Sequence, residues 1–85
     1  MRKVEKDTYS VADLRLAAFL KLRDFKLRRI DNGSDGKCVF VFEDHPDRPG
    51  LIVNFLNRQE LVEPISFIEE QRNLKGVCRQ SQANR

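Results

Sequence analysis

The sequence contains no tryptophan and only one tyrosine, one methionine and one histidine. It has no apolar run near the roughly 18 residues of a membrane-spanning helix, so we expect no membrane contact. The phosphate-binding loops, nucleophile turns and paired-histidine motifs of common enzyme classes are also absent. These absences predict a protein that is not an enzyme and uses no cofactor.

The length of 85 residues fits one domain, spanning 1–85, with an ordered core over about 8–78 and frayed polar termini. Cys38 and Cys78 lie 40 positions apart, which matches no metal or redox motif. We expect two reduced, half-buried thiols rather than a disulfide. The charged N-terminus lacks the apolar stretch of a signal peptide, and we therefore predict a cytoplasmic location.

The first helix is predicted over residues 11–23. Ser10 followed by Asp13 forms a capping signature, and Thr8 is the alternative cap. The apolar side chains of this helix fall on two stripes, so the helix is either central to the domain or shared with a partner. Leu16, Phe19 and Leu20 are accordingly the candidate protein interface.

A hairpin is predicted next, with strands over 25–30 and 38–42 joined by the glycine-rich turn 31–36. Ile30 breaks the alternation of the first strand, which indicates a bulge or the end of the strand near Arg29. The second strand is apolar on both faces, and we expect it to be the best covered strand of the sheet.

In the last third of the chain, one local pattern fits two kinds of structure. Residues 50–57 fit either a strand or a short helix, and residues 60–63 read as extended before Pro64. Pro64 is expected to open a final helix that runs to about Val77, or ends earlier at Gly76. The fold class is thus α+β, a small antiparallel sheet packed against helices, in the order α-β-β-α-(β)-α, with residues 60–63 as the candidate third strand.

Several short motifs occur together along residues 8–75, each of them once. They are Thr8-Tyr9-Ser10, Leu16-Ala17-Ala18-Phe19-Leu20, Cys38-Val39-Phe40-Val41-Phe42-Glu43-Asp44, Val62-Glu63-Pro64 and Leu74-Lys75. This combination resembles a family of small prokaryotic domains of unknown function. The resemblance implies a helix after the Phe-Glu-Asp motif, hence over 50–57, and it implies no activity. Pro49-Gly50 departs from the helix formers expected there.

The densest charged feature is a basic cluster at the end of the first helix and on the first strand. Its members are Lys21, Arg23, Lys26, Arg28 and Arg29. Lys and Arg so placed can contact phosphates, which makes weak, sequence-independent nucleic-acid binding the alternative function. The competing interpretation is a solvated sheet face whose charges protect an edge strand.

Potential metal ligands crowd at one place, the acidic turn 43–47. Because His45 is the sole histidine, we expect no metal site there and interpret Asp44 or Asp47 as a helix cap. Taken together, these features predict a binding or accessory domain that acts through another protein chain or a second copy of itself, with nucleic acid possible as a partner but not favoured.

Overall fold

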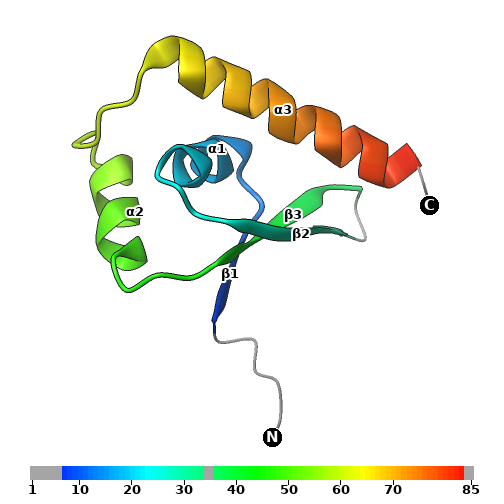
Figure 1. The fold of residues 1–85 in the computed structure, drawn as a ribbon, viewed down its shortest axis with the longest axis horizontal. Helices are drawn as coiled ribbons and strands as arrows, with labels where there is room; N and C mark the ends of the chain where they lie inside the picture. The colour runs from blue at the N-terminus through cyan, green and yellow to red at the C-terminus, as the bar shows by residue number, and fades with distance from the viewer. Residues whose placement is uncertain (1–6, 34–35, 84–85) are drawn as a thin grey trace, which may run out of the picture.

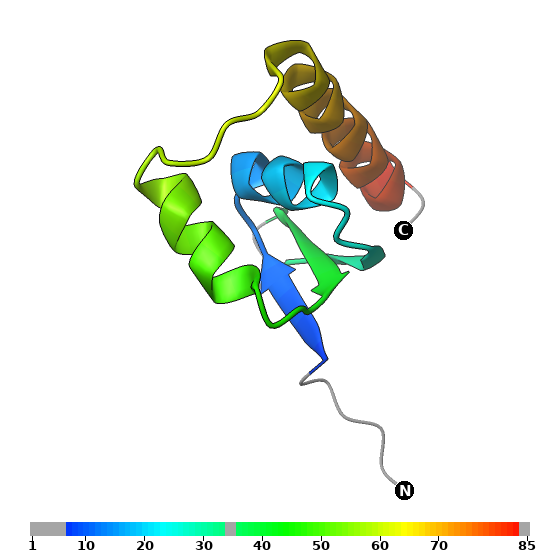
Figure 2. The same cartoon turned by 60° about the vertical axis from the view of Figure 1, so that its left-hand side comes forward.

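In the part of the chain that the structure describes, three helices accompany a three-stranded antiparallel sheet. The helices lie on one side of the sheet (Figures 1 and 2). The computed structural model describes residues 7–33 and 36–83. The elements are β1 (Thr8–Val11), α1 (Leu14–Leu22), β2 (Leu27–Asn32), β3 (Cys38–Glu43), α2 (Arg48–Leu56) and α3 (Pro64–Ala83). The predicted α+β class is confirmed. The termini were predicted to fray over 1–7 and about 80–85, but residues 80–83 belong to α3. Residues 1–6 and 84–85, and residues 34–35 of the predicted turn, lie outside the described residues.

The strand order is β1-β3-β2, with both pairings antiparallel. The central strand, β3, is the one predicted to be best covered, and Phe40, Val41 and Phe42 on it are buried. The register shifts between Leu27 and Arg29, which confirms the predicted bulge.

The third strand is β1, and not the predicted segment 60–63, which the structure shows without strand pairing. Tyr9 pairs with Phe42 and Val11 with Phe40, so β1 places its aromatic and β-branched residues against β3. The predicted helix caps Ser10 and Thr8 are therefore wrong, because both belong to this strand.

Helix α1 begins at Leu14, three residues later than predicted, because Asp13 is its cap. The Asp13 carboxylate accepts a hydrogen bond from the Arg15 backbone N–H at 2.9 Å. The helix lies between the sheet, α2 and α3 (Figure 2), as its two apolar stripes suggested. Phe19 and Leu20 are completely buried, so they cannot form the predicted interface, and Leu16 is half-buried against the same core.

Of residues 50–57, all but Asn57 are helical, since α2 spans Arg48–Leu56 with a proline in its first turn. The ring of Phe55 stacks on the ring of Phe19, with centroids 4.5 Å apart. This contact closes one end of the core over α1.

Helix α3 begins at Pro64, as predicted, and continues through Gly76 to Ala83, beyond the predicted end at Val77. The Glu63 carboxylate accepts hydrogen bonds from the backbone N–H groups of Ile65 and Ser66, which satisfies the start of the helix. Figure 1 shows α3 crossing above α1 and reaching the turn between β2 and β3.

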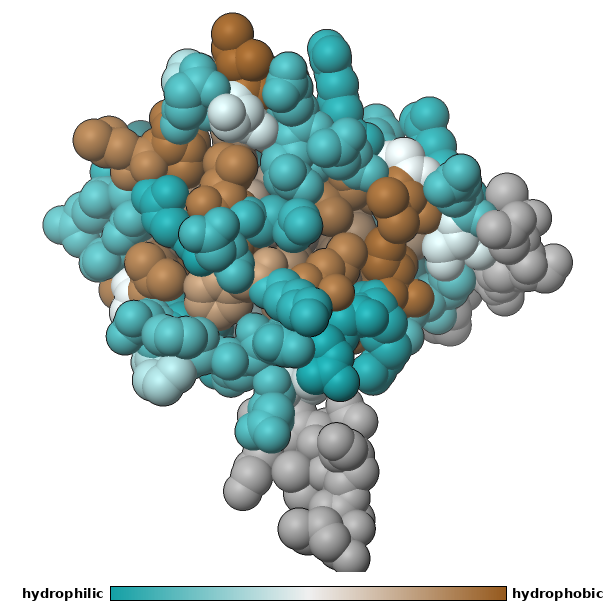
Figure 3. Space-filling view, viewed as in Figure 1, coloured by the Kyte–Doolittle hydropathy of each residue, from teal (hydrophilic) through white to brown (hydrophobic). Residues whose placement is uncertain are grey.

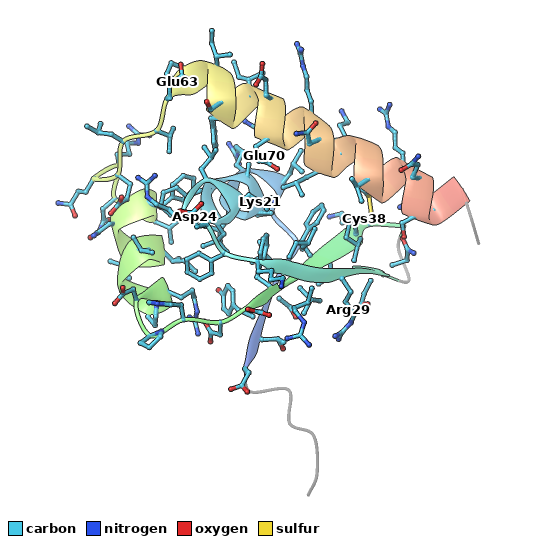
Figure 4. All side chains as sticks on the ribbon, viewed as in Figure 1. Lys21, Asp24, Arg29, Cys38, Glu63 and Glu70 are labelled. Carbon is cyan, nitrogen blue, oxygen red and sulfur yellow. A yellow bond between two sulfur atoms is a disulfide. The ribbon has the colours of Figure 1, made fainter. Side chains whose placement is uncertain are left out.

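A disulfide joins Cys38 on β3 to Cys78 on α3, with Cα atoms 6.0 Å apart (Figure 4). The prediction of two reduced thiols is therefore wrong. The spacing of 40 residues gave no sign of proximity, whereas the path of α3 over the start of β3 brings the two sulfur atoms together. Disulfides persist mainly in oxidising compartments, so the cytoplasmic location stays a prediction that rests on the charged N-terminus.

Candidate functional site

The five members of the basic cluster do not form one free cationic patch. Figure 4 shows Lys21 on α1 and Arg29 on the sheet. Arg28 donates to Glu43 at 3.4 Å and Arg29 donates to Asp31 at 3.1 Å. Both arginines are exposed on the edge strand β2, and each has an acid beside it. Their pairing reduces the positive field that a phosphate would meet.

Arg23 has a structural position in the same cluster. Its guanidinium donates to the Glu60 carboxylate at 3.0 Å and to the Leu61 carbonyl at 2.7 Å, and it lies over the ring of Phe19. Hydrogen bonds from Arg23 and then from Asn54 hold the pKa of Glu60 below its usual value. Arg23 therefore connects the end of α1 to the linker, which we define as residues 57–63 between α2 and α3.

Lys21 and Lys26 are the two members of the basic cluster that form no ion pair within residues 7–33 and 36–83. Lys21 is half-buried, and Lys26 is exposed just before β2. Phosphate binding at this cluster would thus depend on these two lysines and on arginines that already have carboxylate partners.

At the acidic turn 43–47, one arginine of α2 contacts both an aspartate of the turn and a tyrosine of β1. Arg48 donates from two nitrogens to the Asp44 carboxylate, at 3.0 and 3.1 Å, and its guanidinium lies 3.9 Å from the centre of the Tyr9 ring. The Arg48 hydrogen bond lowers the pKa of Asp44, and the pKa of Arg48 is raised in turn. Both carboxylate oxygens of Asp44 are therefore engaged by an arginine.

His45 lies beside a polar hollow of about 190 Å³ that is also lined by Phe25, Lys26 and Glu43. The backbone N–H of Asp47 donates to His45 Nδ1 at 3.1 Å, so this nitrogen is an acceptor. Across the described part of the chain, no group of three or more His, Cys, Asp or Glu side chains is arranged to hold a metal ion. Cys38 is in the disulfide and has no free thiolate to serve as a nucleophile with His45.

The structure reveals an apolar surface that the sequence analysis missed. We call it the corner surface, and it comprises Val53 and Leu56 on α2, Leu61 in the linker and Ile65 on α3. Their exposed fractions are 55%, 68%, 87% and 63%. Figure 3 shows hydrophobic side chains at the upper left, over the linker and the start of α3. Val53 and Leu56 are three residues apart and so lie on one face of α2. This spacing was the feature of the sequence from which the exposed apolar face could have been predicted.

Leu61 is the most exposed member of the corner surface, and its backbone is fixed. Its carbonyl accepts the hydrogen bond from Arg23, whose side chain is only 29% exposed. The linker is therefore anchored to α1 at the residue whose apolar side chain points into solvent. A fixed backbone lowers the entropy that a partner must overcome on binding.

These observations define a class of protein, a small α+β domain with three helices on one side of a three-stranded antiparallel sheet. The chain belongs to the family described as Domain of unknown function (DUF5659), whose model matches residues 6–80. This confirms the resemblance to a family of unknown function. No curated protein and no solved structure matches the chain. Among the helices of the described residues, none has both the length and the apolar composition needed to cross a membrane.

Proposed function

We propose that this chain is a non-enzymatic interaction domain that associates with a second copy of itself through the corner surface. The observation that carries the proposal is Leu61, whose side chain is 87% exposed while its carbonyl is held by Arg23. Exposed apolar side chains that gather at one place are typical of protein contacts, whereas isolated ones need no explanation.

The charge of the corner surface supports a second copy as the partner. Residues 49–57, which include Val53 and Leu56, contain no charged side chain. A symmetric dimer brings each surface against its own copy, so charges of one sign would repel across the interface. The α2 part of the corner surface is uncharged and avoids this repulsion, and the contact adds buried area to a thin core.

Sedimentation equilibrium at several protein concentrations tests the proposal. We expect a monomer–dimer equilibrium that does not weaken between low and near-physiological salt, because apolar contacts are not screened. Leu61→Glu should abolish the dimer by placing a charge at the interface. Gln59→Glu adds the same charge at another exposed position of the linker and should leave the dimer intact. A monomer at every concentration, or equal loss in both variants, would overturn the proposal.

The alternative, nucleic-acid binding through the basic cluster, predicts a different result. A labelled oligonucleotide would bind at low salt and be released steeply as salt rises, and Arg28→Glu with Arg29→Glu would abolish the binding. That outcome in a fluorescence anisotropy titration would replace self-association as the proposed function. Circular dichroism of each variant establishes that the fold is retained.

A further inference from the structure

A second surface, separate from the corner surface, lies between α1 and α3. Two hollows of about 290 and 250 Å³ share Leu14 and Lys75, so they are adjacent along the same groove. We call this the α1–α3 groove. Its apolar lining includes Leu14, Phe40 and Ile68.

The rim of the α1–α3 groove is positively charged. Arg72, Lys75 and Arg79 line it from α3, and among the residues that the structure describes no acidic one lines either hollow. All three side chains are exposed, and none forms an ion pair within residues 7–33 and 36–83. They differ in this from Arg23 and Arg28, which have carboxylate partners. Spacings of three and four residues place them along one side of α3, where an anion would relieve their mutual repulsion.

The shape of the groove selects the class of ligand. It follows α3 from Ile68 to Gln82, a distance of roughly 21 Å at 1.5 Å per residue. A small anion would occupy one hollow and leave the other empty. A nucleic acid would match the cations but leave the apolar lining without contacts, and the lining aromatic Phe40 is buried and offers no face for base stacking.

We infer that the α1–α3 groove binds an acidic segment of a partner protein in which carboxylates alternate with apolar side chains. The apolar side chains occupy the two hollows beside Leu14, and the carboxylates pair with Arg72, Lys75 and Arg79. An extended segment of about seven residues spans the groove. None of these residues belongs to the corner surface, and the two surfaces come nearest at Ile68, which lies one helical turn from Ile65 on α3.

The test is a fluorescence anisotropy titration with a labelled peptide of about seven residues that alternates glutamate and leucine. Two control peptides replace the leucines by serine or the glutamates by lysine. We expect the glutamate–leucine peptide to bind most tightly. Lys75→Glu with Arg79→Glu should weaken its binding by at least about tenfold, since two attractive pairs become repulsive. Arg28→Glu with Arg29→Glu makes the same change in charge on the sheet and should leave the affinity unaltered.

Three results would overturn the inference. The glutamate–leucine peptide binds no more tightly than the serine control, or the two double variants lose affinity equally, or a DNA oligonucleotide binds more tightly than the peptide and is lost in the Lys75→Glu, Arg79→Glu variant. The last result would assign the groove to nucleic acid. Sedimentation of the same variants separates this site from the corner surface, because the dimer should persist when peptide binding is lost.

Discussion

Arg23 and Glu60 lie 37 positions apart in the sequence, and their side chains meet at 3.0 Å. Both side chains are largely shielded, with 29% and 17% of their surface exposed, so salt screens this pair less than a pair on the surface. The same arginine also binds the Leu61 carbonyl. One guanidinium therefore holds the linker at two neighbouring residues beside the end of α1.

Replacing Arg23 by glutamine should lower the free energy of unfolding, because Glu60 and the Leu61 carbonyl then lose their donor. Lys26→Gln removes the same charge from an exposed position in the basic cluster and should change stability by no more than about 0.5 kcal/mol. Urea denaturation of the two variants measures the difference. Equal midpoints would show that the Arg23 contacts contribute nothing to stability.

Removing the disulfide through Cys38→Ala with Cys78→Ala should destabilise the protein by roughly 2–4 kcal/mol. The bond closes a loop of 40 residues and so restricts the unfolded chain. Urea denaturation with and without a reducing agent measures the effect in the unaltered protein. The double variant is the control, since reductant should not change its midpoint. An unaltered protein that is equally insensitive to reductant would contradict the prediction.

Acid should destabilise the fold through three carboxylates whose pKa values are lowered. Hydrogen bonds act foremost, from Arg48 to Asp44, from Arg23 to Glu60 and from Ser66 to Glu63. When the pKa of a carboxyl is lower in the folded state than in the unfolded state, the carboxylate stabilises the fold. This stabilisation is complete above the unfolded-state pKa, about 4, and is lost as the pH falls through the folded-state pKa. Stability should thus be level from about pH 7 to 5 and decline below about pH 4.

Denaturation at a series of pH values checks this acid profile, and Glu63 offers a specific variant. Glu63→Gln should lower stability at neutral pH and reduce the loss at acid pH, because one titrating cap has been removed. Glu69→Gln, at an exposed position on the helix that Glu63 precedes, is the control and should leave the profile unchanged. A stability that increases as the pH falls below 4 would contradict the assignment.

Two glycines should respond to alanine in opposite ways. Gly76 lies within α3 with open space around it, so Gly76→Ala should stabilise the protein by about 0.5–1 kcal/mol. Gly36 also has open space but has a φ of +84°, which an L side chain adopts at a cost, so Gly36→Ala should destabilise by about 1 kcal/mol. Thermal denaturation of both variants provides the comparison. A stabilised Gly36→Ala would show that this turn can change its conformation freely.

The elements that the sequence predicted correctly are those with strong local patterns. The two apolar stripes of α1 indicated a central helix, and Phe19 and Leu20 are completely buried. The doubly apolar strand is β3, at the centre of the sheet. Pro64 marks the start of α3. In each case the burial of neighbouring side chains agrees with the local pattern.

The features that the sequence did not predict depend on contacts between distant residues. β1 is only four residues long. Its pairing with β3 makes Ser10 part of a strand, although the spacing of Ser10 and Asp13 is that of a helix cap. The Cys38–Cys78 bond and the Arg23–Glu60 pair depend on the path of the chain in space. The distance between two residues in the sequence does not reveal this path. The cations of the α1–α3 groove are three or four residues apart in the sequence, because they lie on one side of a helix. A search for charges close together in the sequence therefore found residues 21–29 and missed this group.

The disulfide also divides the chain into a covalent ring and a segment outside it. The ring runs from Cys38 to Cys78 and includes β3, α2 and most of α3. Helix α1, which fills the core, precedes this ring in the sequence and is held against it by packing. A backbone break within the linker would leave every fragment connected through the sulfur atoms. A break between β2 and β3 would leave the residues before it, which include β1, α1 and β2, attached to the ring by noncovalent contacts alone. A single cleavage therefore has different consequences in the linker and in the β2–β3 turn.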